Sequence, residues 1–164
     1  MAERYDTARI CENGHIINGA LSMAPQDTTK FCSHCGAKGI DICSACNSQI
    51  RGASLYSTFH GDWNIGGPLL RPPAYCQSCG VPFPWTTQRL EVARELISEM
   101  DELVDADKES LKLSLPDLVK DSPRSEIAVS RYRKIIAKAA DTSREGLKKL
   151  LWMVVTEATK KALF

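Results

Sequence analysis

Seven cysteines and one histidine in the first half of the chain have the spacing of metal ligands. Six of the cysteines form three CxxC pairs: Cys32 with Cys35, Cys43 with Cys46, and Cys76 with Cys79. The two-residue gap lets both thiolates of a pair point at one ion. The seventh, Cys11, begins the segment Cys11-Glu12-Asn13-Gly14-His15, where the Asn-Gly turn signal brings His15 back beside it. Seven thiolates and one imidazole make eight ligands, which predicts two tetrahedral Zn²⁺ sites with no ligand left over.

The pairing of these ligands has two alternatives. In sequence order, Cys11, His15, Cys32 and Cys35 make one site, and Cys43, Cys46, Cys76 and Cys79 make the other, each as a zinc ribbon. In a cross-brace, Cys11 and His15 would instead join Cys43 and Cys46. The short step from Cys35 to Cys43 suits two adjacent ribbons and favours sequence order. Gly36, Asn47 and Gly80 follow the three pairs, and these residue types tolerate the positive φ that such tight loops need.

The predicted sites are structural rather than catalytic. Four protein ligands close the coordination shell and leave no position for a water molecule. A thiol-redox enzyme typically has one reactive CxxC pair beside a βαβ unit, whereas this sequence has three pairs in Gly-rich loops. His34, inside a CxxC pair, is the alternative to His15 as a ligand, and His60 is interpreted as a loop residue.

Composition divides the chain into two parts. The sequence has 164 residues and a formal net charge of +1, and nine of its ten glycines and all seven cysteines precede residue 81. Gly and Pro interrupt the first part too often for long regular elements, whereas the second part has helical composition. We expect a small metal-bound β fold of two zinc ribbons over residues 1–84, followed by an all-α helical domain over residues 85–164.

The composition also narrows the class of protein. The N-terminal residues lack the apolar core of a signal peptide, and the longest strongly apolar run, Leu150 to Val155, is far shorter than the ~20 residues of a membrane span. We therefore expect a soluble, cytoplasmic protein without a membrane partner. Seven thiolates and two Zn²⁺ ions lower the formal charge from +1 to about −2, which disfavours nucleic-acid binding on bulk charge.

The segment between Cys46 and Cys76 is too long for a minimal hairpin. Its aromatic side chains include Tyr56, Phe59, His60 and Trp63. In one interpretation the aromatics of an elaborated ribbon tip cover a core that is too small to close alone. In the other, the segment is a recognition loop with aromatic anchors and with Arg51 and Arg71 as polar contacts.

The second part is predicted to contain three or four short helices. Apolar residues at helical spacing mark the segments 87–105, 107–115, 123–141 and 143–162. Pro116 is expected to end the second helix, and Ser122-Pro123 is a helix-start signal. Trp152 and Met153 widen the apolar stripe of the last helix, which makes this helix the first candidate for a partner surface.

Basic residues gather in the last third of the chain. Arg131, Lys134 and Lys138 lie at helical spacing and form a ridge, with Lys148 and Lys149 further along the sequence. Arg124 and Arg133 lie nearby. The ridge is either a solvated face, facing the acidic first helix, or a surface that contacts phosphates.

Several segments together resemble a family of uncharacterised bacterial double zinc-ribbon proteins with a C-terminal helical region. They are Ile10–Gly19, Lys30–Gly36, Cys43–Gly52, Pro73–Thr86 and Ser114–Arg124. The resemblance covers nearly the whole chain. It implies a bacterial origin, metal at the eight ligands above and a ribbon-then-helix layout, and it implies no activity.

No set of residues forms a convincing catalytic site, because a Ser/His/Asp grouping, a P-loop and a pair of carboxylates in a Gly-framed pocket are all missing. We therefore expect a non-enzymatic zinc-binding adaptor whose helical region docks on a protein partner or self-associates. The alternative is a nucleic-acid-binding protein that uses the ribbon loops and the basic ridge. A thiol-redox or zinc-dependent enzyme is the third hypothesis.

Overall fold

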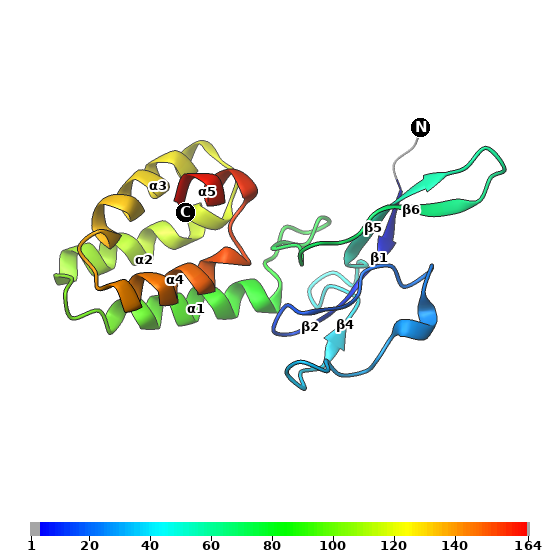
Figure 1. Ribbon diagram of the computed structural model, residues 1–164, viewed down its shortest axis with the longest axis horizontal. Helices are drawn as coiled ribbons and strands as arrows, with labels where there is room; N and C mark the ends of the chain where they lie inside the picture. Colours follow the sequence, from blue (N-terminus) through cyan, green and yellow to red (C-terminus); the bar gives the residue numbers. More distant parts are fainter. Residues whose placement is uncertain (1–3, 164) are drawn as a thin grey trace. The chain divides into compact units, whose positions relative to one another are not determined.

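The computed structural model of the chain describes residues 4–163. Within them the chain forms two compact units that divide between Thr86 and Thr87. The first unit contains small antiparallel sheets and the second contains helices, as Figure 1 shows. The predicted fold class, a small β part with two cysteine clusters followed by an all-α part, is confirmed.

The described part of the first unit has two three-stranded antiparallel sheets, with strand orders β1-β5-β6 and β3-β2-β4. The strands are β1 (Arg4–Thr7), β2 (Arg9–Cys11), β3 (Ile16–Asn18), β4 (Gly39–Ile40), β5 (Arg51–Ser57) and β6 (Trp63–Gly67). A short 3-10 helix covers Pro25–Asp27. Most of these strands are only two to five residues long. Loops and turns therefore hold much of this unit together.

Sulfur atoms take part in the small core of the first unit. The buried residues of this core are Ala8, Ile10, Cys43, Ile50, Cys76, Phe83 and Trp85. The rings of Phe83 and Trp85 stack with their centroids 4.7 Å apart, and Trp85 Nε1 donates a hydrogen bond to the Pro73 carbonyl at 2.8 Å. Two of the cysteines are thus part of the apolar core rather than appended to it.

The structure has five helices among the described residues, where the sequence predicts three or four. They are α1 (Pro84–Ser98), α2 (Asp105–Val119), α3 (Pro123–Ile136), α4 (Asp141–Trp152) and α5 (Glu157–Leu163). The start of α3 at Pro123 agrees with the Ser-Pro signal, and the Ser122 N–H donates to Ser125 Oγ at 3.1 Å, as in a capping box.

Three predicted helix ends are wrong. The helix expected over residues 123–141 ends at Ile136. The helix expected to reach Asp105 ends at Ser98, and a new helix begins at Asp105 after the extended residue Val104. Pro116 does not end α2 but lies inside it. A proline in a helix removes one backbone hydrogen bond at a cost of about 3 kcal/mol. Leu118 and Val119, both buried after the proline, offset this cost.

The single last helix predicted over residues 143–162 is two helices. Helix α4 ends at Trp152, and α5 begins at Glu157. Thr156 Oγ1 accepts a hydrogen bond from the Thr159 N–H at 3.2 Å, which is the contact of an N-cap. Val154 and Val155 between the helices are buried, so the break itself contributes to the core.

The second unit has an ordinary apolar core, to which four of its helices contribute leucine, isoleucine and alanine side chains. Leu111, Leu115, Leu118, Leu147 and Leu151 are fully inaccessible to solvent. No helix in residues 4–163 combines the length and the apolarity needed to cross a membrane.

Candidate metal centre

The three CxxC pairs adopt the same turn. In each, the N–H of the residue after the second cysteine donates to the carbonyl of the first cysteine at 2.8–2.9 Å. The first cysteine in turn donates its N–H to the carbonyl five residues on, in Ala37, Ser48 and Val81. Gly36, Asn47 and Gly80 have φ values of 70°, 58° and 72°. The prediction of positive φ at these three positions is therefore confirmed.

A fourth turn holds Cys11 and His15. The Gly14 N–H donates to the Cys11 carbonyl at 2.7 Å, and the His15 N–H lies 3.2 Å from Cys11 Sγ. Gly14 has a φ of +87°, and a Cβ atom on it would lie 2.9 Å from Trp85 Cβ. The Asn-Gly turn thus returns His15 to Cys11, as predicted, and does so directly against the buried tryptophan.

The eight predicted ligands meet in two clusters. The first cluster comprises Cys11, His15, Cys32 and Cys35, and the second comprises Cys43, Cys46, Cys76 and Cys79. Within each cluster the ligand atoms all lie within 4.8 Å of one another. The structure therefore groups these residues in sequence order and not as a cross-brace. The His34 ring lies 5.7 Å from that of His15, centroid to centroid, and His34 does not join the first cluster.

Three sulfurs and one imidazole nitrogen form the first cluster. His15 Nδ1 lies 3.6 Å from Cys11 Sγ, 3.6 Å from Cys32 Sγ and 3.3 Å from Cys35 Sγ. The Sγ atoms of Cys11 and Cys35 are 3.7 Å apart. A disulfide requires about 2.05 Å, so these sulfurs are too far apart to be bonded and are instead arranged like ligands around a common centre.

Four sulfurs form the second cluster. Cys43 Sγ lies 3.8 Å from Cys79 Sγ, and Cys46 Sγ lies 3.6 Å from Cys76 Sγ. The hydroxyl of Ser48 lies 3.0 Å from Cys46 Sγ and 3.2 Å from Cys76 Sγ. Ser48 was not predicted from the sequence, because the hydroxyl contacts a sulfur 28 residues away.

Hydrogen bonds and close thiols shift the pKa values within the clusters. The backbone of Ala37 contributes most to lowering the pKa of Cys35 to about 6. The Ser48 side chain contributes most to lowering the pKa of Cys76 to about 6, and it also lowers the pKa of Cys46. A backbone hydrogen bond at Val81 lowers the pKa of Cys79, but the adjacent thiols and burial raise it to about 12. Thiols packed this closely cannot all ionise unless a cation joins them.

Each cluster is anchored at the edge of the apolar interior. Cys11 and Cys32 of the first cluster are buried, as are Cys43 and Cys76 of the second. The second cysteine of every CxxC pair is exposed. A metal bound at either cluster would therefore join the core on one side to a surface turn on the other.

The segment between Cys46 and Cys76 forms the hairpin of β5 and β6. Phe59 in its turn is fully exposed, and half of the Tyr56 surface is exposed. The guanidinium of Arg51 stacks over the Tyr5 ring, 3.3 Å from its centroid. These two aromatics do not cover a core, so the first interpretation of this segment is wrong for them.

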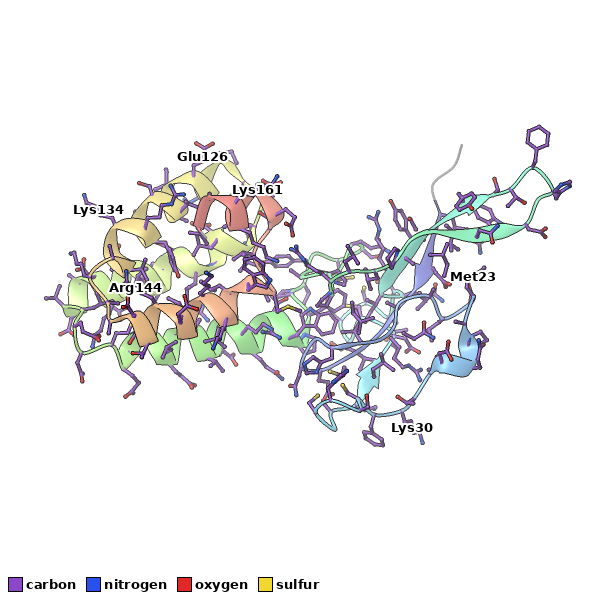
Figure 2. The ribbon with its side chains drawn as sticks, viewed as in Figure 1. Met23, Lys30, Glu126, Lys134, Arg144 and Lys161 are labelled. Carbon is purple, nitrogen blue, oxygen red and sulfur yellow. The ribbon has the colours of Figure 1, made fainter. Side chains whose placement is uncertain are left out.

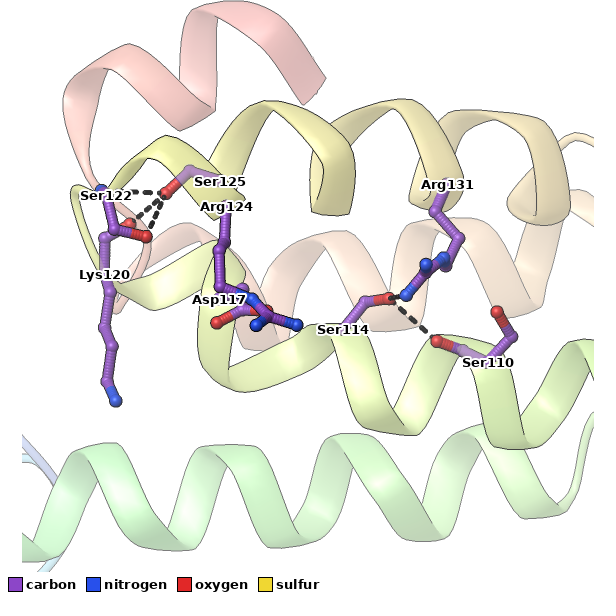
Figure 3. A network of polar contacts seen from close by, with 8 residues as sticks. All are labelled: Ser110, Ser114, Asp117, Lys120, Ser122, Arg124, Ser125 and Arg131. Atoms are coloured by element: carbon purple, nitrogen blue, oxygen red, sulfur yellow. Dashed lines mark hydrogen bonds and ion pairs between the residues drawn. The ribbon is translucent and has the colours of Figure 1, made fainter.

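The predicted basic ridge is partly neutralised by α2. Arg131 Nη1 lies 3.2 Å from Ser114 Oγ, in the network that Figure 3 shows. Lys138 pairs with Asp107 at 2.6 Å, and Arg124 pairs with Asp117 at 3.4 Å. At Arg131 and Lys138 the ridge therefore contacts side chains of α2.

The comparisons with known proteins yield one finding. A family model described as "Uncharacterized protein conserved in bacteria (DUF2321)" matches residues 4–163. No curated protein and no solved structure matches the chain.

Proposed function

The chain belongs to this DUF2321 family of bacterial proteins, and we propose that it is a non-enzymatic interaction module whose two clusters each hold a structural Zn²⁺ ion. The observation that carries the metal assignment is the spacing of the ligand atoms. Zn–S bonds of about 2.3 Å place tetrahedral sulfurs about 3.8 Å apart. The sulfur–sulfur separations of 3.6–3.8 Å in the structure fit this geometry.

The donor chemistry supports zinc over harder cations. Thiolate and imidazole ligands suit Zn²⁺, whereas Ca²⁺ and Mg²⁺ require oxygen ligands. Four protein ligands at each cluster would leave no coordination position for a substrate or a water molecule. The role proposed for the metal is therefore to hold the turns together, not to perform chemistry.

The test is the metal content of the full chain, purified without added metal and measured by inductively coupled plasma mass spectrometry. We expect two zinc ions per chain and no thiol that reacts with a disulfide reagent in the native protein. A chelator strong enough to remove both ions should abolish the dispersed amide signals of the first unit. A chain without metal whose thiols react readily would support a thiol-redox protein and contradict the proposal. Two iron ions per chain would contradict the zinc assignment.

The interaction role is supported by exposed apolar side chains on the helical part. Leu113 on α2 is 74% exposed, Ile127 on α3 is 61% exposed, and Trp152 at the end of α4 is 45% exposed. If these side chains gather into one patch, that patch would suit contact with a protein partner or with a second copy of the chain. Sedimentation of the wild type, compared with the Leu113→Ser and Ile127→Ser variants, tests self-association. If the wild type is a monomer at all concentrations, self-association is excluded, and the proposed partner is then a different protein.

One observation favours nucleic acid as a second candidate. Helices α4 and α5 border an open hollow of about 550 Å³ that is lined by Trp152, by the lysines Lys148, Lys149, Lys160 and Lys161, and by Glu145 and Glu157. The two glutamates pair with Lys148 and Lys160, which leaves Lys149 and Lys161 as the lysines of the lining that these two ion pairs do not involve. Figure 2 labels Lys161 on α5 and Lys134 on α3. An aromatic ring among ammonium groups suits stacking of a base beside a phosphate.

The test of this candidate is binding of a fluorescent 20-nucleotide DNA strand across a salt series. Each lost phosphate contact should reduce the slope of log affinity against log salt by about 0.7. We expect Lys149→Gln and Lys161→Gln each to reduce the slope. Lys120→Gln is the control, because Lys120 is exposed and lies outside both the hollow and the basic ridge. No binding at low salt would eliminate the nucleic-acid candidate and leave the metal assignment untouched.

A further inference from the structure

A row of three exposed side chains on α3 separates two hollows of the helical unit. Glu126, Ser130 and Lys134, spaced by four residues, belong to the lining of both hollows. One hollow, of about 780 Å³, lies between α3 and α5, and the other, of about 690 Å³, lies between α2 and α3. We call these three residues the α3 row. Because the surface is hollowed on both of its sides, the row is accessible to a second helix.

The two charges of the α3 row have no partner within the described part of the chain. Neither the Glu126 carboxylate nor the Lys134 ammonium forms a hydrogen bond or an ion pair with another of the residues 4–163. Figure 2 shows both side chains pointing outward from α3. Arg124, Arg131 and Lys138, by contrast, contact side chains of α2. The α3 row therefore presents one acid and one base that are available to another molecule.

The α3 row is complementary to a second copy of itself in an antiparallel arrangement. Glu126 and Lys134 lie four residues on either side of Ser130, about 12 Å apart along the helix axis. When two rows lie side by side in opposite directions, Glu126 of each copy lies beside Lys134 of the other. In a parallel arrangement like charges would lie together and repel. A twofold interface requires this kind of self-complementarity, because the same patch contacts itself.

The packing of helices allows two such rows to come together. Residues spaced by four form ridges on a helix, and ridges of this kind on two helices pack into each other's grooves at a crossing angle of about −50°. Ser130 is small, so it permits close approach at the centre of the row. Ile127, 61% exposed, lines the hollow between α2 and α3. A second row in this hollow would remove Ile127 from water, which favours association.

From these observations we propose that the α3 rows of two copies of this chain pack antiparallel in a twofold dimer. Each row lies in the hollow between α2 and α3 of the other copy, with one Glu126–Lys134 ion pair on either side of the twofold axis. Ion pairs at the edge of an interface determine orientation more than affinity, so burial of Ile127 supplies much of the affinity. The dimer rests on the interaction role proposed above and is independent of the metal assignment.

The experiment measures dimerisation of the metal-loaded full chain by analytical ultracentrifugation over a concentration series. We expect a monomer–dimer equilibrium that weakens as salt is added, because salt screens exposed ion pairs. Glu126→Lys and Lys134→Glu should each weaken dimerisation at least tenfold, since like charges then meet at both ends of the row. The double variant, Glu126→Lys with Lys134→Glu, exchanges the two charges and should restore the wild-type affinity.

A mixture of the two single variants tests the antiparallel arrangement directly. Glu126→Lys has a lysine at both ends of the row, and Lys134→Glu has a glutamate at both ends. We expect each variant alone to stay monomeric at concentrations where the wild type dimerises, whereas the equimolar mixture should form a heterodimer. Uniform ¹⁵N labelling of one variant lets native mass spectrometry distinguish the heterodimer from both homodimers.

Matched variants control for the change in charge and for the apolar contact. Glu95 on α1 and Lys120 between α2 and α3 are exposed and lie outside both hollows. Glu95→Lys and Lys120→Glu make the same changes in charge and should dimerise as the wild type does. Ile127→Ser should weaken dimerisation without changing the charge. Every variant is first checked for wild-type metal content and for dispersed amide signals.

The results that would overturn the dimer differ from those that would overturn the interaction role. A wild type that is monomeric at all concentrations excludes the dimer but leaves a different protein as the partner. If the wild type and both single variants dimerise equally well, self-association stands and uses another surface. The antiparallel row is also rejected if the mixture forms no heterodimer, or if the Glu95 and Lys120 variants weaken dimerisation as much as those of the row.

Discussion

The two ligand clusters differ in how they accommodate closely packed sulfur atoms. In the first, the imidazole of His15 takes the place of a fourth cysteine. In the second, four thiolates come together, and the Ser48 hydroxyl lies within 3.2 Å of two of them. A donor beside a thiolate stabilises its negative charge. Replacing a cysteine by histidine reduces the number of thiolates in a cluster, whereas a donor outside the ligand set stabilises the negative charge of the thiolates that remain.

The clusters also differ in their attachment to the core. Cys43 and Cys76 of the second cluster belong to the apolar core of the first unit. In the first cluster, the turn from Cys11 to His15 packs through Gly14 against Trp85. The second cluster is thus a component of the core, whereas one turn of the first rests on it.

Loss of a whole metal ion in cysteine variants tests whether the two clusters bind metal independently. Cys43→Ser should reduce the metal content from two ions to one, because Cys43 shares its cluster only with Cys46, Cys76 and Cys79. Cys32→Ser should remove the other ion. Substitution with ¹¹³Cd gives one NMR signal for each coordination sphere and shows which ion remains.

Two other patterns of lost ¹¹³Cd signals would contradict independent metal binding. If Cys43→Ser removes both ¹¹³Cd signals while Cys32→Ser removes one, the first cluster depends on the core that Cys43 helps to form. If both variants lose both ions, the clusters do not bind metal independently, and the comparison between them fails.

The ligands of both clusters could be predicted from the sequence because their signals are local. Each CxxC pair and the Asn-Gly turn before His15 determine a loop within a few residues. Ser48 could not be predicted in this way. It follows one CxxC pair but contacts Cys76 of another, and this contact exists only once the two turns are brought together.

The helical part shows where local rules compete with packing. The cap signal at Ser122 correctly predicts the start of α3. Pro116 misleads because burial of the following leucine and valine outweighs its local effect in α2. The break before α5 has a local signal in Thr156, but the apolar stripe across it reads as one continuous helix. The pairing of β1 with β5 joins segments more than 40 residues apart, and periodicity carries no information about it.

The stability of a Gly14 variant tests how the turn from Cys11 to His15 is attached to the core. Gly14→Ala places a Cβ atom 2.9 Å from Trp85 Cβ at a φ of +87°, so it should lower the free energy of unfolding by about 3 kcal/mol. Gly36→Ala is the control, because its φ is also positive but no atom lies within 4 Å of the added Cβ. It should cost only about 1 kcal/mol. Urea denaturation of the metal-loaded protein measures both, and equal costs would contradict the role of Trp85.

A small change in metal affinity is expected when the Ser48 hydroxyl, which distinguishes the second cluster, is removed. Ser48→Ala should weaken metal binding at the second cluster by about tenfold, the lower end for partners of metal ligands. Ser48→Thr keeps the hydroxyl and should restore the affinity, and Ser44→Ala, in the same CxxC turn, removes a hydroxyl that makes no described contact with sulfur. Competition with a chromophoric chelator, read at the ¹¹³Cd signal of each cluster, separates the two sites. If Ser48→Ala affects both clusters equally, the hydroxyl acts on the fold and not on the thiolates, and the proposed difference in charge compensation is lost.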